Sequence, residues 1–188
     1  MKDEEVLQIL RESGALLKGH FELRSGLHSD SYFQCANVLR YPRRAEKLCS
    51  ALAAKIKAAE TGADCVISPA VGGIIVGHEI ARALGLPAIF AEKENGKLAM
   101  RRFRIEAASK FIVAEDVVTR GGRVQETIDI VKNSGGRAAA AVFLVDRSGG
   151  KVDFGCPAYS LLEMQSVTYE PENCPLCSKG IPLKHPGS

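Results

Sequence analysis

The chain has 188 residues, with 25 Lys and Arg against 22 Asp and Glu, which gives a formal net charge of +3. This excess is too small to predict nucleic-acid binding from bulk charge. The hydrophobic fraction of 46% is too high for a disordered chain. The length suits one domain with a substantial core, and we expect a single domain over residues 1–188.

The N-terminus and the cysteines indicate the compartment. No apolar run reaches the ~18 residues that a membrane span needs. The opening MKDEEVLQIL lacks the apolar core of a signal peptide. We therefore expect a cytoplasmic protein with no membrane partner. Its six cysteines are scattered, mostly in apolar surroundings, which favours reduced thiols over a disulfide framework: Cys35, Cys49, Cys65, Cys156, Cys174 and Cys177.

The first sixty residues predict a helix, a strand-like segment and a second helix. Residues 3–13 form the first helix, with Asp3 as its cap and Gly14 at its end. Residues 21–33 are strand-like around the polar turn SGLHSD. Pro42 suits the first turn of the second helix. The buried stripe of that helix is predicted to be Ala45, Leu48, Leu52 and Ile56.

After Gly62, short apolar strands alternate with helices. The predicted strands are 64–68, 87–91, 110–114, 138–145 and 158–162, and the predicted helices are 74–84 and 124–134. Their apolar runs are continuous rather than alternating, which is typical of a parallel sheet covered on both faces. The sequence thus predicts an α/β fold whose ligands bind beyond the carboxyl ends of the strands.

Two glycine-containing turns join a predicted strand to a predicted helix. The first is SPAVGGI, residues 68–74, and the second is TRGGR, residues 119–123. Backbone N–H groups in such turns, together with a helix N-terminus, bind anions. The first turn alone could equally be a tight connection. The second lacks the spacing of a Walker A loop, and the chain has no G-x-G-x-x-G motif.

Glu115 and Asp116 come directly before the second turn. Carboxylates repel phosphate, but they accept hydrogen bonds from two vicinal ribose hydroxyls beside it. They could also hold a cation bound to the same ligand, or simply cap the helix. Together, the acids and the turn point to a sugar phosphate.

Four stretches in order resemble one enzyme family. EDVVTRGG resembles the ribose-5-phosphate and diphosphate-binding signature of type I phosphoribosyltransferases. GALLKGHFELRSGLHSDSYFQ, SPAVGGIIVG and FLVDR resemble segments of the orotate-specific members of that family. The resemblance covers nearly the whole chain, including the CPLC and IPLKHPGS tail. It implies the type I fold, with an N-terminal hood at about 1–40 and a mobile loop at about 92–104.

The resemblance also implies roles for individual residues. Glu115 and Asp116 face the ribose hydroxyls, and Arg147 and Thr119 contact orotate, with Tyr32 and Phe33 stacking near the base. The diphosphate loop is Ala70, Val71, Gly72 and Gly73. Contacts to 5-phosphoribosyl 1-diphosphate (PRPP) are implied for Arg24, Lys93, Lys97, Arg101, Glu115, Asp116, Val117, Val118, Thr119, Arg120, Gly121, Gly122 and Arg123. Of these, Lys93, Lys97, Glu115 and Asp116 are the catalytic candidates.

Arg120 and Arg123 replace the small residues that the family commonly has at these positions. They either add charge to the phosphate site or point to solvent, and the cradling amides are unchanged in both cases. Residues 92–104 carry five basic residues against two acids. This segment is either a solvated hairpin or the family's closing loop, whose cations neutralise the leaving diphosphate.

The implied reaction transfers 5-phosphoribosyl from PRPP to orotate and releases diphosphate, in a homodimer. Mg²⁺ is the expected cofactor, bound mainly through PRPP, and we assign it no protein ligand. A PRPP-sensing regulator without catalysis and a purine phosphoribosyltransferase are the alternatives. The basic segment argues against the first, and RSGLHSDSYF and FLVDR argue against the second.

The motif CPLC at 174–177 supplies two of the four ligands that structural zinc usually takes. His185 and Cys156 are conceivable partners, but their spacing matches no ligand pattern. We therefore expect a tail turn with two reduced thiols. His28 is expected to border the site without a catalytic role, and His78 to be structural.

Overall fold

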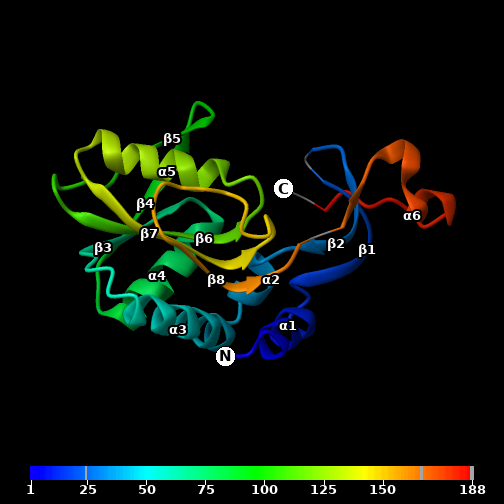
Figure 1. Ribbon diagram of the computed structural model, residues 1–188, viewed down its shortest axis with the longest axis horizontal. Coiled ribbons are helices and arrows are strands. Elements are labelled where there is room, and N and C mark those ends of the chain that lie inside the picture. The colour runs from blue at the N-terminus through cyan, green and yellow to red at the C-terminus, as the bar shows by residue number, and fades with distance from the viewer. Residues whose placement is uncertain (24, 166, 187–188) are drawn as a thin grey trace.

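The computed structural model describes residues 1–23, 25–165 and 167–186. Within these residues the strands form a central six-stranded sheet and a separate three-stranded sheet. Arg24, expected to contact PRPP, lies outside the described residues. Figure 1 shows the larger layered body beside the smaller sheet, which carries the C-terminal segment.

The central sheet has the strand order β5-β4-β3-β6-β7-β8. Its strands are β3 (Cys65–Pro69), β4 (Ala88–Glu94), β5 (Lys97–Ala99), β6 (Lys110–Val118), β7 (Arg137–Asp146) and β8 (Ala158–Glu163). All neighbouring pairs are parallel except β4 and β5, which form an antiparallel hairpin. The prediction of a mostly parallel sheet is confirmed.

Helices cover both faces of this sheet, as predicted (Figure 1). Helices α3 (Pro42–Ala58) and α4 (Gly72–Leu84) pack on one face, and α5 (Gly122–Asn133) packs on the other. Successive side chains of a strand point to opposite faces of the sheet, so the core is divided into two clusters, one on each face. Val66 joins the α3 and α4 side, for example, while Ile67 joins the α5 side.

The small sheet forms the hood expected near the N-terminus. It contains β1 (Leu16–Glu22), β2 (His28–Phe33) and β9 (Thr168–Tyr169), all antiparallel. A 3-10 turn (Pro171–Asn173) and the short helix α6 (Pro175–Ser178) follow β9. The hood therefore contains a C-terminal segment that the sequence did not indicate.

Helices α1 (Asp3–Glu12) and α2 (Ala36–Leu39) belong to the main body by their packing. Val6 and Leu10 of α1 lie in the same core cluster as the buried stripe of α3. That stripe, at Ala45, Leu48, Leu52 and Ile56, is fully buried as predicted. These contacts tie the chain on both sides of the hood hairpin to the central sheet.

Two local predictions were wrong. Asp3 does not cap α1, because the cap position is Lys2 and no side chain caps the helix there. The first strand begins at Leu16, not at residue 21, and its pairing with β2 shifts between Lys18 and Phe21. This irregularity breaks the alternation by which a strand is recognised in a sequence.

Across the described residues, no helix is both long enough and apolar enough to cross a membrane.

Candidate active site at the carboxyl edge of the sheet

Three segments meet where β3, β6 and β7 end. Loop 70–73 follows β3, residues 115–123 span the end of β6 and the start of α5, and Arg147 directly follows β7. The three strands are neighbours and parallel, so their carboxyl ends lie at one edge. This is the position at which open α/β sheets bind ligands.

The acid pair is packed directly against the first glycine turn. A Cβ atom added at Gly72 would lie 2.8 Å from Asp116 Oδ2, and one at Gly73 would lie 3.0 Å from Glu115 Oε1. Any side chain at either position would displace a carboxylate. The two turns are therefore parts of one site, and both glycines are needed for this close approach. The peptide bond between Ala70 and Val71 is cis, and Val71 is 81% exposed.

Burial determines the electrostatics of the two acids. Glu115 is only 6% exposed, and its pKa lies well above the ordinary value, first because of burial and then because of the Asp116 charge. Burial also raises the pKa of Asp116. The backbone N–H of Asp116 donates to Glu115 Oε1 over 3.1 Å, and that of Val117 donates to Asp116 Oδ1 over 2.7 Å. The carboxylates are thus held in place but incompletely stabilised, as is common at functional sites.

The second turn opens helix α5. Gly121 caps the helix with φ +74, while Thr119 and Arg120 are exposed. Arg123 Nη1 donates to the carbonyl oxygen of Ala70 over 2.9 Å, so it bridges the two turns. Arg123 therefore bonds to the backbone of loop 70–73 although it is exposed, and its contact with PRPP stays a prediction. Arg120 is exposed to solvent.

The backbone of Val117 and Val118 is already engaged. The N–H of Val117 donates to Asp116, and the carbonyl of Val118 accepts from Arg147 N–H over 2.8 Å. The Val118 side chain is 2% exposed. These two residues position the acids and Arg147, and their contact with PRPP stays a prediction.

Gly121→Ala should destabilise the protein more than an ordinary glycine replacement. A Cβ there would lie 2.7 Å from Val152 Cγ1 and 2.8 Å from Phe154 Cε1, at a positive φ. Overpacking of a core costs about 1–3 kcal/mol, and the left-handed conformation about 1–2 kcal/mol. We expect a loss of roughly 2–5 kcal/mol, measured by urea unfolding.

Gly85→Ala is the matched control for that variant. Gly85 has φ +73 and no atom within 4 Å of an added Cβ. It isolates the conformational cost from the collision, so it should lose only about 1–2 kcal/mol. Equal losses in the two variants would show that Val152 and Phe154 move aside without cost.

Arg147 lies between the central sheet and the hood. Its guanidinium is 5.6 Å from the centre of the Phe33 ring, and burial lowers its pKa. Tyr32 acts electrostatically on Arg147, which places the two side chains in one neighbourhood. Phe33 is 4% exposed, so its ring packs beneath Arg147 in the core.

Cys35 is a site residue that the sequence did not indicate. It is 1% exposed, and burial raises the pKa of its thiol well above the ordinary value. The charges of Asp116 and Glu115 raise this pKa further, whereas Arg147 lowers it. The buried Cys35 thiol is therefore within electrostatic reach of both the acid pair and Arg147. No sequence pattern marks a single buried thiol in this role.

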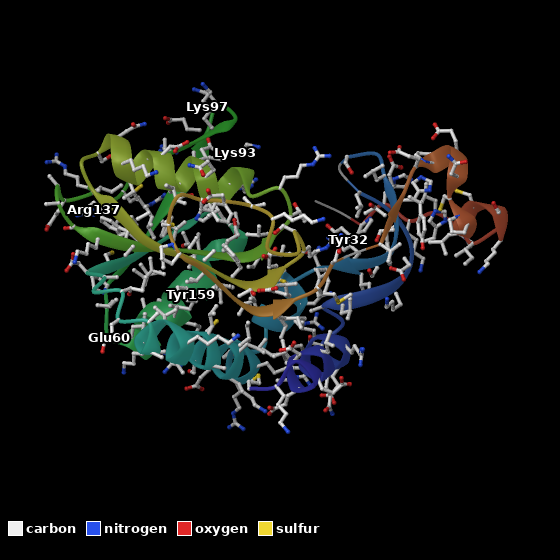
Figure 2. All side chains as sticks on the ribbon, viewed as in Figure 1. Tyr32, Glu60, Lys93, Lys97, Arg137 and Tyr159 are labelled. Carbon is white, nitrogen blue, oxygen red and sulfur yellow. The ribbon has the colours of Figure 1, made fainter. Side chains whose placement is uncertain are left out.

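The basic segment 92–104 begins as the β4–β5 hairpin. Ala91 O accepts a hydrogen bond from Ala70 N over 2.8 Å, so β4 continues past loop 70–73. The hairpin is anchored to α5, because Leu98 N donates to Glu126 Oε1 over 2.6 Å. Figure 2 shows Lys93 and Lys97 standing on the hairpin, well apart from Tyr32 on β2.

Two arginines of the segment pair with acids of the hairpin. Arg101 Nε lies 3.7 Å from Glu94 Oε1, and Arg102 pairs with Glu92. The Arg101 side chain is 55% exposed, so this pair is weak, and its contact with PRPP stays a prediction.

The chain matches the phosphoribosyl transferase domain family over residues 37–176. It is 52% identical to an orotate phosphoribosyltransferase of Carboxydothermus hydrogenoformans, over 98% of this chain and 97% of that protein. It is 50% identical to one of Pelotomaculum thermopropionicum, over 100% and 98% of the two chains.

Solved structures share the fold at lower identity. The crystal structure of orotate phosphoribosyltransferase from Aeropyrum pernix has a TM-score of 0.72 at 24% identity and covers 85% of this chain and 93% of that one. An adenine phosphoribosyltransferase from Thermoanaerobacter pseudethanolicus has a TM-score of 0.63 at 17% identity, with 71% and 88% covered. The fold is therefore that of the phosphoribosyltransferases. By its close relatives, the chain belongs to the orotate phosphoribosyltransferase family.

Proposed function

We propose that the protein transfers the 5-phosphoribosyl group of PRPP to orotate, giving orotidine 5′-phosphate and diphosphate in pyrimidine biosynthesis. The observation that carries this reading is the contact between Gly72 and Gly73 of one turn and the acid pair of the other. It brings two anion-binding turns and two hydroxyl acceptors to one point. PRPP has this combination of groups: a phosphate, a diphosphate and vicinal hydroxyls on one sugar.

The two ends of PRPP would occupy the two turns. The N–H groups of residues 119–123, at the N-terminus of α5, bind the 5-phosphate. Those of residues 70–73 bind the diphosphate, while Glu115 and Asp116 accept hydrogen bonds from the ribose hydroxyls. Arg123 fixes the spacing between the turns through its bond to Ala70.

The base would bind between β7 and the hood. Arg147 presents a planar donor fork to the anionic edge of orotate. Tyr32, within electrostatic reach of Arg147, is next to Phe33 on the hood strand, and Thr119 is exposed at the neighbouring strand end. Phe33 supports the guanidinium from below and does not stack on the base, because its ring is buried.

Catalysis would depend on positioning and on charge. The sugar carbon gains positive character as diphosphate leaves, and a deprotonated orotate nitrogen needs no further activation. Lys93 on β4 and Lys97 on β5 would neutralise the departing charge as segment 92–104 closes over the site.

Mg²⁺ fits this site. The acids offer hard oxygen ligands, and two carboxylates beside a phosphate-binding turn are compatible with an ion that keeps most of its bonds to ligand oxygens and water. Glu115 and Asp116 would hold it through the ribose hydroxyls. When bound, the ion neutralises charge on the diphosphate.

A homodimer is part of the proposal. Lys93 and Lys97 stand away from Tyr32 of the same chain (Figure 2), so the hairpin of one protomer can serve the site of its partner. Mixing a Lys93→Ala, Lys97→Ala protein with an Arg147→Ala protein tests this, since hybrid dimers would regain one intact site.

The activity itself is tested by mixing protein, orotate, PRPP and Mg²⁺ and following the loss of orotate absorbance. We expect a loss that requires all three small molecules. No loss, with PRPP binding intact, would instead identify a sensor. Turnover with a purine but not with orotate would identify a purine phosphoribosyltransferase instead.

A further inference from the structure

Four metal-ligating side chains meet at the far side of the hood from the active site. His20 is on β1 and His28 is on β2. Cys174 directly precedes helix α6, and Cys177 lies within it. One ligand atom from each lies within 4.8 Å of all the others. Figure 1 shows α6 in orange and red beside β1 and β2, at the opposite end of the small sheet from the central sheet.

Four of the six distances between the ligand atoms are close to the edges of a zinc tetrahedron. Zinc bonds of about 2.0–2.1 Å to nitrogen and about 2.3 Å to sulfur give edges of about 3.3 Å between nitrogens and about 3.5 Å between nitrogen and sulfur. Cys174 Sγ lies 3.5 Å from His20 Nε2, and Cys177 Sγ lies 3.4 Å from His28 Nδ1 and 3.8 Å from His20 Nε2. The two ring nitrogens are 2.9 Å apart, so this pair would have to separate by a few tenths of an ångström.

The hydrogen bond that His20 makes also favours the tautomer that a metal ligand needs. Its Nδ1 lies 2.8 Å from the carbonyl oxygen of Ile181, and a nitrogen facing a carbonyl must donate. Nε2 of the neutral ring therefore has its lone pair directed at the cluster. This single lone pair faces His28 and both thiols, more potential donors than it can accept from. A metal-bound imidazole commonly has this arrangement, with the other nitrogen bonded to a backbone carbonyl.

The tail around these cysteines has no hydrophobic core of its own. Among the described residues of 170–186, Cys174 is the only buried one, at 1% exposed. Three of the four cluster residues are nevertheless buried, because His20, His28 and Cys174 are 1%, 6% and 1% exposed, whereas Cys177 is exposed at the edge of the cluster. Otherwise the tail is joined to β1 by backbone bonds between Lys184 and both His20 and Glu22. A segment that folds without apolar burial needs another source of stability, and structural zinc supplies it.

We propose that His20, His28, Cys174 and Cys177 bind one Zn²⁺ in a closed tetrahedral site that fixes the C-terminal tail to the hood. Thiolate and imidazole ligands favour zinc over Mg²⁺ or Ca²⁺, and four protein ligands leave no open position for catalysis. Each thiol loses its proton to solvent on binding. The site also clamps the β1–β2 hairpin, which carries Tyr32.

This corrects the partners considered for CPLC in the sequence. His185 Nδ1 lies 3.0 Å from Glu22 Oε2, outside the cluster. Cys156 packs in the core on the α5 side of the central sheet. The side chains that lie beside both cysteines are instead those of the two hood histidines, His20 and His28.

The test is the metal content of the whole chain, purified without a metal-binding tag after expression with zinc in the medium. We expect about one zinc per chain, lost in the Cys174→Ser, Cys177→Ser double variant and in His20→Gln. Cys156→Ser is the matched control and should keep its zinc. Cobalt substitution of the wild type should give thiolate charge-transfer bands and the intense visible bands of a tetrahedral site.

A second measurement avoids dependence on the folding of the variants. Titrating wild-type thiols with a mercurial should release zinc in step with modification. Limited proteolysis should then cut the tail after residue 170, which resists cleavage in the zinc-bound protein. Zinc well below one per chain, a Cys174–Cys177 disulfide, or a double variant that retains the metal would each overturn the proposal.

Discussion

The double variant Glu115→Gln, Asp116→Asn should lose activity on the order of 10²–10³-fold or more in kcat/KM for PRPP, which is the scale found for removal of one preorganised hydrogen-bonding group. Amides retain an oxygen for the N–H donors of residues 116 and 117. They replace the other carboxylate oxygen by an N–H₂ group that cannot accept from a ribose hydroxyl. Initial rates with varied PRPP at saturating orotate measure this effect.

The same variant should be more stable than the wild type at neutral pH. The pKa of both carboxyls is raised in the folded protein, first by burial, so the native state binds more protons than the unfolded chain between the unfolded and folded pKa values. Stability of the wild type therefore falls as pH rises through that window. The amides remove this loss, so the double variant should have the higher Tm at neutral pH, measured by thermal unfolding. For a chain of this size, a stabilisation of about 1 kcal/mol corresponds to about 2–4 °C in Tm.

Asp129→Asn, on the exposed surface of α5, is the control for this pair. It changes the same chemical group away from the site and should alter neither activity nor the pH dependence of stability. Stabilisation without loss of turnover in the double variant would show that the acids are a strained structural pair with no part in ribose binding.

Arg147→Ala should reduce kcat/KM for orotate by roughly 30- to 4,000-fold. Truncating one partner of a buried charge pair costs about 2–5 kcal/mol, and every 1.4 kcal/mol is about tenfold. The fold should suffer far less, because the contact of the guanidinium with the Phe33 ring is worth only about 0.5–2 kcal/mol. Steady-state kinetics and thermal unfolding separate the two effects.

Arg147→Lys is the informative companion to that variant. It keeps the charge but loses the bidentate fork, so it should recover only part of the orotate affinity. PRPP binding, measured by calorimetry, should be unchanged in both variants. Wild-type turnover of orotate by Arg147→Ala would remove this residue from the base site.

The central architecture was predictable because its signals are local. Continuous apolar runs such as residues 110–114 are typical of buried parallel strands, and Gly85 ends α4 with a positive φ as a terminal glycine does. The acid pair and both glycine turns were likewise visible in the sequence, since each is a short contiguous motif.

Contacts between distant segments were not predictable. Cys174 meets His20 across 154 positions of the sequence, and no periodicity encodes that pairing. Nor could the sequence show that Gly72 and Gly73 approach the acids, or that Arg123 bonds to Ala70. These features arise from the order of strands in the sheet, which the chain does not specify locally.

A crystal structure with PRPP and Mg²⁺ bound would test the central claim most directly. The account predicts the 5-phosphate on the amides of residues 119–123, the diphosphate on residues 70–73, and the two ribose hydroxyls within hydrogen-bond distance of Glu115 and Asp116. A bound PRPP whose ribose hydroxyls face away from both carboxylates would contradict it.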